Sequence, residues 1–263
     1  MPCLRIAYDG RHFSGSQRQL DVRTVEGDII DALKDADYMN DIDDLEVFRM
    51  ASRTDKGVSA RENLLNIVHK GRKDLTKNNR LKRVNSILRN VWITGISEGQ
   101  YVPPLYKEYH YFTKMSDFDE DLLDRICATF SGSHNFKHFS KYDPRKETVR
   151  EIEMDHVNGE GLLTLVFRGR GFLWQMCRRV ASATMSCLDG NIELCEIESM
   201  LRGVSDTKVQ PAPPENLVLY SIRSEIELDD IESGISSMKE HYDNEISNSL
   251  VNIAMGRDII SEM

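Results

Sequence analysis

The chain has 263 residues, of which 40% are hydrophobic and 29% charged, a composition typical of a folded protein with a sizeable core. A formal net charge of -9 and a sequence pI near 5.3 count against a uniformly basic nucleic-acid binder. No apolar run approaches the roughly 20 residues that span a bilayer, and the N-terminus does not resemble a signal peptide, so we expect a cytoplasmic protein that does not enter a membrane.

Strand and helix patterns alternate along the first part of the chain. The expected elements, in chain order, are a strand over 4–8, a helix over 25–35, strands over 45–50 and 63–68, a helix over 77–88 and a strand over 91–96. The helix over 77–88 is basic and amphipathic, with Leu81, Val84 and Leu88 on one face. This order mixes strands and helices and predicts an α+β fold.

A similar order follows in the second part of the chain. The expected elements are a strand over 109–115, a helix over 119–130, strands over 147–156 and 162–167, helices over 172–188 and 192–201, and a strand over 217–226. The doubled pattern predicts two related halves, residues 1–102 and 103–230, with the break near Pro103 and Pro104.

The remaining residues, 231–263, form an acidic tail. Apolar residues recur there at steps of three or four, which predicts an amphipathic helix. They are Ile231, Ile235, Met238, Tyr242, Ile246, Leu250 and Ile253. We expect this helix to dock on the body of the protein, and a contact between two copies of the chain is the alternative.

The negative charge is unevenly placed along the chain. Residues 225–263 contain ten acidic and two basic side chains, whereas residues 1–224 contain 33 acidic and 32 basic ones. Residues 70–89 alone contain eight basic side chains and one acid. Because charges are screened beyond a Debye length of about 10 Å, such local stripes decide phosphate binding and the overall charge does not exclude RNA. The alternative for this stripe is a solvated helix face.

The five cysteines are scattered and have no paired spacing. This pattern predicts reduced, mostly buried thiols and argues against a disulfide framework or a zinc site. We therefore expect no metal.

One octapeptide, residues 53–60, concentrates the residues that can carry chemistry. Its sequence is Arg-Thr-Asp-Lys-Gly-Val-Ser-Ala, and it follows the apolar segment 45–50. Gly57 allows a sharp turn that would project the carboxylate of Asp55 toward a substrate. Taken alone, the octapeptide is also good chemistry for an ordinary polar turn.

The octapeptide and four further segments resemble motifs of the TruA family of tRNA pseudouridine synthases, in the same order. The further segments are residues 7–19 (Ala-Tyr-Asp-Gly, then Phe-Ser-Gly-Ser-Gln-Arg-Gln), 23–33 (opening Arg-Thr-Val-Glu-Gly), 171–178 (Gly-Phe-Leu-Trp-Gln-Met-Cys-Arg) and 211–217 (Pro-Ala-Pro-Pro-Glu-Asn-Leu). Two departures stand out: Ser16 stands where the family usually has Trp, and Glu215-Asn216 replaces a common Lys/Glu-Gly pair. Neither departure touches Asp55, so they concern substrate contacts more than chemistry.

The resemblance implies a fold and an activity. The fold would be two ferredoxin-like halves that share a mostly antiparallel central sheet, with the active-site cleft between them. The activity would be conversion of uridine to pseudouridine in the anticodon stem-loop of tRNA, around positions 38 to 40, without a cofactor. The resemblance also implies a homodimer whose two subunits hold one tRNA.

Three residues are the candidate catalytic set. Asp55 is the candidate nucleophile, which would add to C6 of the base or assist formation of a glycal at the sugar. Arg178 is the candidate partner that would hold Asp55 ionised through a bidentate ion pair. Tyr109 would stack on the flipped uracil or take part in proton transfer at C5. The alternatives are an Arg178 that faces solvent or phosphate and a Tyr109 that is only a core aromatic.

Basic residues near the motifs are candidate RNA contacts. They are Arg18, Arg23, Arg53, Lys56, Lys77, Arg80, Lys82 and Arg83. A uridine in a stem must flip out to expose C1′ or C6, and phosphate contacts would supply that energy. Two alternatives remain: a non-catalytic RNA-binding protein on this scaffold, and a pseudouridine synthase acting on other uridines of tRNA or of small RNAs.

Overall fold

The computed structural model describes residues 2–71, 73–97, 103–114, 117–141, 143, 145–159, 161–205 and 207–261. The first half contains β1 (Cys3–Tyr8), α1 (Val25–Asp35), β2 (Leu45–Met50), β3 (Ser59–His69), α2 (Arg80–Ile87) and β4 (Val91–Ser97). The second half contains β5 (Tyr106–Lys114), α3 (Glu120–Phe130), β6 (Gly132–Asn135), β7 (Val149–Gly159), β8 (Leu162–Gly169), α4 (Met176–Leu188), α5 (Leu194–Leu201) and β9 (Leu217–Arg223). A short strand β10 (Asp229–Asp230) and the helix α6 (Glu232–Ser261) follow.

Both halves repeat one order of strands within a single ten-stranded sheet. The first half has the order β4-β1-β3-β2, and the second has β9-β5-β8-β7, with β6 added at its edge. In each half the strands and the helices that connect them follow the β-α-β-β-α-β sequence of a ferredoxin-like unit, and the second half adds β6 and a further helix, α5. The predicted α+β fold, with two ferredoxin-like halves on one mostly antiparallel sheet, is confirmed. The predicted boundary at residue 102 lies outside the described residues and stays a prediction.

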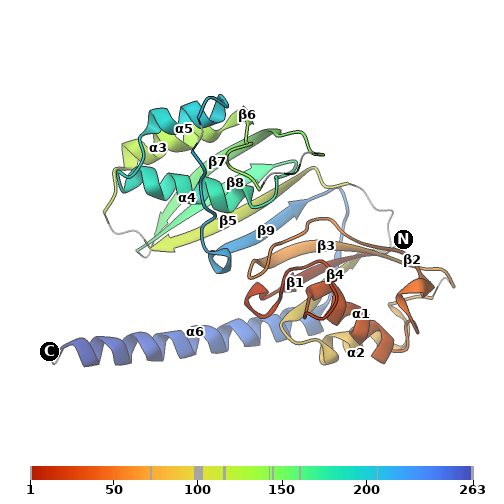
Figure 1. The fold of residues 1–263 in the computed structure, drawn as a ribbon. Coiled ribbons are helices and arrows are strands. Elements are labelled where there is room, and N and C mark those ends of the chain that lie inside the picture. Colours follow the sequence, from red (N-terminus) through yellow and green to blue (C-terminus); the bar gives the residue numbers. More distant parts are fainter. Residues whose placement is uncertain are drawn as a thin grey trace.

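The two halves join where the first residues of β3 pair with the first residues of β9. Ser59 lies opposite Val218 and Ala60 opposite Leu219, in a parallel pairing, whereas the strand pairs inside each half are antiparallel. Figure 1 shows these two strands side by side at the centre of the sheet. Because both strands begin at this junction, the loops that precede them meet there. The turn with Asp55 is one of these loops.

The helices cover the sheet with the residues that the periodicity selects. In α1 the buried residues include Ile29 and Leu33, and in α2 they include Leu81 and Val84. Leu88, which ends the predicted apolar face of α2, is also buried. Burial of these faces explains why the short helices hold their places, because packing contributes more to helix stability than propensity does.

The expected helix over 172–188 begins later than predicted. Gln175 adopts a left-handed conformation with φ of 62°, so α4 begins at Met176 and the residues before it form a turn. Apolar composition suggested a continuous helix from Phe172, but composition does not report a single left-handed residue. The correction matters because the turn presents Trp174 to the neighbouring loop.

The tail forms the predicted helix, and the docking prediction holds for only part of it. The first half of α6 packs on β4 and α2, with Ile235, Met238 and Tyr242 partly buried. Ile246 and Leu250 are 57% and 61% exposed, and Figure 1 shows this end of α6 extending beyond the body. Among the described residues, no helix combines the length and apolar character that crossing a membrane requires.

Candidate active site

The turn that carries Asp55 is shaped by close backbone approaches. Gly57 has φ of 86°, and a Cβ added there would lie 3.0 Å from Cγ of Pro214 in the loop before β9. The N–H of Val58 closes the turn by donating to the carbonyl of Asp55 at 3.2 Å. Glycine is therefore required at this position both for its conformation and for the contact between the two loops.

Ser16 braces the same turn from the opening loop of the chain. Its Oγ accepts a hydrogen bond from the N–H of Thr54 at 2.9 Å, and its own N–H donates to the carbonyl of Thr54 at 3.1 Å. Ser16 is fully buried. Ser16, which stands where the TruA family usually has Trp, therefore supports the turn next to Asp55 and is not exposed to solvent.

Asp55 contacts one donor with each carboxylate oxygen. Its Oδ2 accepts a hydrogen bond from an Nη of Arg178 at 3.2 Å, and its Oδ1 accepts one from Nε1 of Trp174 at 3.0 Å. The side chain of Asp55 is 25% exposed, while that of Arg178 is 11% exposed. Asp55 and Arg178 were predicted to pair although they lie more than a hundred positions apart in the chain. They are in contact at the junction of the halves.

Arg178 is held in place by the loop before β9. Its Nε donates to the carbonyl of Ala212 at 2.7 Å, and the N–H of Ala212 donates back to the carbonyl of Arg178 at 3.1 Å. The expected bidentate pair with Asp55 is wrong, because Nε is committed to Ala212 and one Nη reaches the carboxylate. The alternative of a solvent-facing Arg178 is also wrong, and the adjacent Arg179 points instead to the carbonyl of Val209 and to Gln175.

A pocket of about 510 Å³ lies beside Asp55 and Arg178. Its lining residues are Arg11, Lys56, Gly57, Arg178, Pro214 and Glu215. This volume is within the range of sites that bind small ligands. Arg11, Lys56 and Arg178 make three cations on its wall, which suits a phosphate-bearing ligand.

Tyr109 is a buried member of the sheet close to this region. Its hydroxyl is 2.9 Å from Oγ of Ser52, which also accepts a hydrogen bond from Nζ of Lys107 at 3.1 Å. Its ring meets Phe172 edge-on at 5.3 Å between centroids. Burial raises the pKa of Tyr109, so its phenol stays protonated at neutral pH. The residue is 6% exposed and is not among the residues that line the pocket.

The predicted RNA contacts fall into three groups. Lys56 lines the pocket, and Arg53 and Arg18 are exposed on the loops around it. Arg23 is engaged within the protein, since its guanidinium donates to Asp28 and to the carbonyl of Arg89.

The basic residues at 77–83 lie elsewhere. Lys77, Arg80, Lys82 and Arg83 are not among the residues that line the pocket. Lys77 pairs with Asp74 at 3.6 Å, Arg80 donates to a backbone carbonyl, and Arg83 pairs with Asp37 at 2.8 Å. If these side chains contact RNA, they do so at a distance from Asp55.

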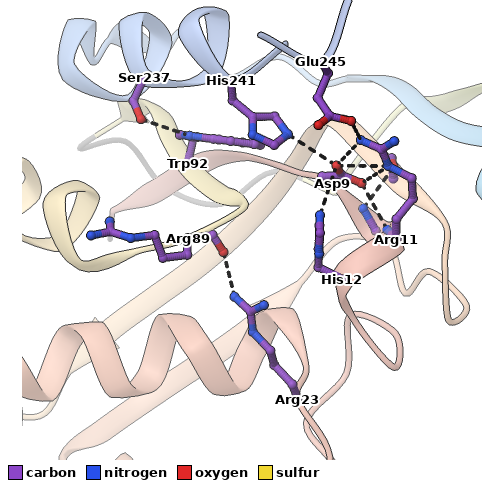
Figure 2. Close-up of polar contacts among 11 residues, drawn as sticks. Asp9, Arg11, His12, Arg23, Arg89, Trp92, Ser237, His241 and Glu245 are labelled. Atoms are coloured by element: carbon purple, nitrogen blue, oxygen red, sulfur yellow. Dashed lines mark hydrogen bonds and ion pairs between the residues drawn. The ribbon is translucent and has the colours of Figure 1, made fainter. Parts of the chain in front are cut away.

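A second carboxylate, Asp9, forms the centre of a polar network between the opening loop and α6 (Figure 2). It accepts hydrogen bonds from the backbone and guanidinium of Arg11 and from Nε2 of His241 at 3.3 Å. The guanidinium of Arg11 also reaches Glu245 at 2.8 Å. Through Arg11, which lines the pocket, the tail helix is connected to the candidate active site.

Sequence reasoning did not find four of these residues: Trp174, Ser16, Arg11 and Ser52. The apolar composition of 172–188 places Trp174 in a helix, and Ser16 stands out in the sequence only as a departure from a family pattern. The one signal in the sequence was a single Trp within the motif 171–178, which also contains Arg178. Ser52 carried none, because its partners Tyr109 and Lys107 lie far away in the sequence. Arg11 lies two residues from Asp9, but its contact with Glu245 and its place on the pocket wall depend on distant parts of the chain.

Comparisons with known proteins assign this chain to a family. Residues 126–223 match a family model described as tRNA pseudouridine synthase. tRNA pseudouridine synthase A of Thermococcus kodakarensis is 36% identical, with 98% of each chain covered, and that of Thermococcus onnurineus is 37% identical, with 98% of this chain and 97% of the relative covered. The same-named protein of Pyrococcus furiosus is 37% identical over 84% of this chain and 83% of its own.

The chain belongs to the tRNA pseudouridine synthase A family, which confirms the resemblance seen in its motifs. A chain in a solved Cbf5–Nop10–Gar1 complex is similar at 13% identity, covering 70% of this chain and 53% of that one, and its TM-score of 0.31 is too low to support an argument.

Proposed function

We propose that this protein converts uridine to pseudouridine in the anticodon stem-loop of tRNA, around positions 38 to 40, with Asp55 as the nucleophile and no cofactor. The enzyme class, an isomerase acting on tRNA uridines, follows from membership of the family. The position of Asp55 carries the proposal for the site: a partly exposed carboxylate at the junction of the two halves, beside a cationic pocket and 3.2 Å from a buried arginine.

The reaction needs a carboxylate and a proton carrier. The N1–C1′ bond breaks, the base rotates, and C5 forms a new bond to C1′; C5 then loses its proton and N1 gains one. Atoms and electrons balance within the substrate, so the chemistry requires no redox partner. Asp55 would add to C6 of the base or assist a glycal at C1′, and both routes need its ionised form.

Arg178 and Tyr109 would support this chemistry in different ways. Arg178 would orient Asp55, since its guanidinium is fixed between the carboxylate and the carbonyl of Ala212. Tyr109 would act as a neutral hydrogen-bond donor, in keeping with the direction of its raised pKa, once the flipped base reaches the Phe172 side of its ring. Ser52 and Lys107 connect to its hydroxyl and would position it.

The RNA would be bound mainly through its backbone. Extruding the target base costs a few kcal/mol, and phosphate contacts by Lys56, Arg53 and Arg18 would offset that cost. On the resemblance alone, we also propose that two copies of the chain hold one tRNA.

The test is pseudouridine mapping on a tRNA transcript incubated with the wild-type protein, with Asp55→Asn and with Asp121→Asn. Asp121 is an exposed acid on α3, so its substitution makes the same charge change away from the site. We expect site-specific pseudouridine from the wild type and from Asp121→Asn, and none from Asp55→Asn, with equal tRNA binding by all three. Pseudouridine formed by Asp55→Asn at the wild-type rate would exclude Asp55 as the nucleophile, and modification outside the anticodon stem-loop would correct the target.

A further inference from the structure

Trp174 occupies an unusual place for a large aromatic side chain. It lies on the turn before α4, is 48% exposed, and donates its indole N–H to Oδ1 of Asp55. The backbone around it is fixed, because its carbonyl accepts a hydrogen bond from the N–H of Lys141 at 2.8 Å and the next residue, Gln175, is left-handed. The ring therefore stands on a rigid turn with about half of its surface in solvent.

The two carboxylate oxygens of Asp55 differ in how readily their hydrogen-bond partners could move away. On the Oδ2 side, Arg178 is buried and tied to Ala212, so it cannot withdraw without breaking those bonds. On the Oδ1 side, the indole of Trp174 is exposed and is held to Asp55 by one hydrogen bond. A substrate atom must come within bonding distance of the carboxylate. The side of Asp55 that can open to admit it is the Oδ1 side, which Trp174 covers.

A cation lies on the same ring. Nζ of Lys141 is 3.9 Å from the centroid of the Trp174 ring. An exposed aromatic ring beside a lysine is the combination with which proteins hold unpaired nucleotides, because the ring stacks on a base and the cation meets a phosphate. The site beside Oδ1 therefore has the chemistry to receive a flipped nucleotide.

We propose that Trp174 is a substrate-contacting residue: in the RNA-free protein its ring covers Oδ1 of Asp55, and on binding it turns aside and stacks on the target uracil that takes its place. This inference rests on the proposed role of Asp55 as the nucleophile, and it makes Oδ1 the attacking oxygen. Lys141 follows the ring and meets the phosphate of the flipped nucleotide.

The protein supplies its own probe for this movement, because it has two tryptophans and the other, Trp92, is 3% exposed and lies under α6. In Trp92→Phe, all tryptophan fluorescence comes from Trp174. We would titrate this variant with a tRNA transcript and with the same transcript carrying an abasic residue at the mapped uridine. The readout is quenching of Trp174 by acrylamide at saturating RNA.

We expect the uridine transcript to protect Trp174 from acrylamide and the abasic transcript to leave it accessible, at equal occupancy. Equal protection by the two transcripts would overturn the proposal, since RNA would then cover the ring without a base against it. No protection by either would overturn it as well. Circular dichroism of Trp92→Phe checks that the variant is folded, and the same titration of wild-type protein gives the result in a second background.

Steady-state kinetics give an independent test. Trp174→Ala removes the stacking surface, so we expect KM for tRNA to rise roughly tenfold, the scale that stacking of one base on an aromatic ring supplies. Trp174→Phe keeps a ring and should stay close to the wild-type KM. A wild-type KM for Trp174→Ala, or equal defects in both variants, would overturn the stacking role.

The two proposals fail in distinguishable ways. If Asp55→Asn were fully active, the nucleophile would be wrong while the fluorescence result would still report the contact between Trp174 and the base. If Asp55→Asn were inactive and the two transcripts protected Trp174 equally, the inference about Trp174 alone would be wrong.

Discussion

Asp9 and Asp55 each face an arginine, yet their surroundings differ in almost every respect. Asp9 is 1% exposed and accepts hydrogen bonds from the backbone N–H of Arg11 at 3.1 Å and from the Arg11 guanidinium at both carboxylate oxygens, with His241 as a further partner. Asp55 is 25% exposed and has one donor on each oxygen. One carboxylate is surrounded by donors, and the other is partly exposed beside residues that line a pocket.

The difference separates a structural carboxylate from the proposed nucleophile. A carboxylate offers about four lone-pair directions. Those of Asp9 are taken by near neighbours that link the opening loop to α6 (Figure 2), so a substrate cannot reach them. Asp55 is partly exposed and has one donor on each oxygen, which leaves lone pairs without a protein donor, and its arginine comes from the other half of the molecule. A carboxylate next to an arginine is thus a candidate nucleophile only where its remaining lone pairs are accessible.

The largest expected effect is on catalysis, in Arg178→Lys. Arginine contacts Ala212 and Asp55 from two nitrogens of one planar group, whereas a lysine has a single flexible ammonium, so Asp55 would lose its oriented cation. We expect kcat for pseudouridine formation to fall by about a hundredfold, with a smaller change in KM. Arg179→Lys is the matched control, because this adjacent arginine donates to Val209 and Gln175 and not to Asp55. An equal loss in both variants would mean that α4 is disturbed as a whole and that Arg178 has no specific role.

The next effect is on stability, in Asp9→Asn. Removing the charge leaves the Arg11 guanidinium without its buried partner, and we expect the free energy of unfolding to fall by about 2–3 kcal/mol. Urea denaturation measures it. Asp143→Asn is the control, since Asp143 binds Arg145 with the same Asp-x-Arg spacing and the same backbone and guanidinium bonds, but Arg145 is 86% exposed. Its loss should be below about 1 kcal/mol. Equal losses would show that burial adds nothing to the Asp9 network.

The pKa of Asp9 adds a dependence on pH to this comparison. Burial by itself raises the pKa, but hydrogen bonds and charge from Arg11 lower it more, so the folded-state pKa lies below the ordinary value of 3.8. A carboxyl whose pKa is depressed by folding adds stability above its unfolded pKa and loses that contribution as the pH falls through its folded pKa. The stability difference between wild type and Asp9→Asn should therefore be constant near neutral pH and shrink below about pH 3.8. A difference that grows with acid would contradict the depressed pKa.

Much of the fold was predictable because its signals are local. The limits of α1 and β2 agree with the expected ranges, since the apolar period and the flanking polar residues define both ends. The pairing of Asp55 with Arg178 was predictable only because the motifs resemble those of a known family. No local pattern relates two residues so far apart.

What the sequence did not predict depends on single backbone angles and on distant contacts. The start of α4 depends on the left-handed Gln175, and the contact between Trp174 and Asp55 depends on that start. The network of Asp9 spans the chain from the opening loop to α6, and His241 and Glu245 appeared only as parts of an amphipathic tail. The spacing of apolar residues predicted which face of α6 packs on the body, but it did not predict which residues that face contacts.

The smallest expected effect concerns the link between these two regions, in Glu245→Gln. Glu245 and Arg11 are 43% and 45% exposed, so their ion pair should contribute less than about 1 kcal/mol to stability. Arg11 also lines the pocket, and a neutral residue at 245 leaves its guanidinium with one carboxylate partner instead of two. KM for tRNA should then fall by roughly twofold at low salt, because the pocket becomes more positive, and the gain should disappear as salt is added.

Glu240→Gln, an exposed acid on the same helix, controls for the change in net charge. A rise in KM for Glu245→Gln alone would contradict this role for Glu245. It would mean that α6 holds Arg11 in the pocket and that the hydrogen bonds from Arg11 to Asp9 do not fix its position by themselves.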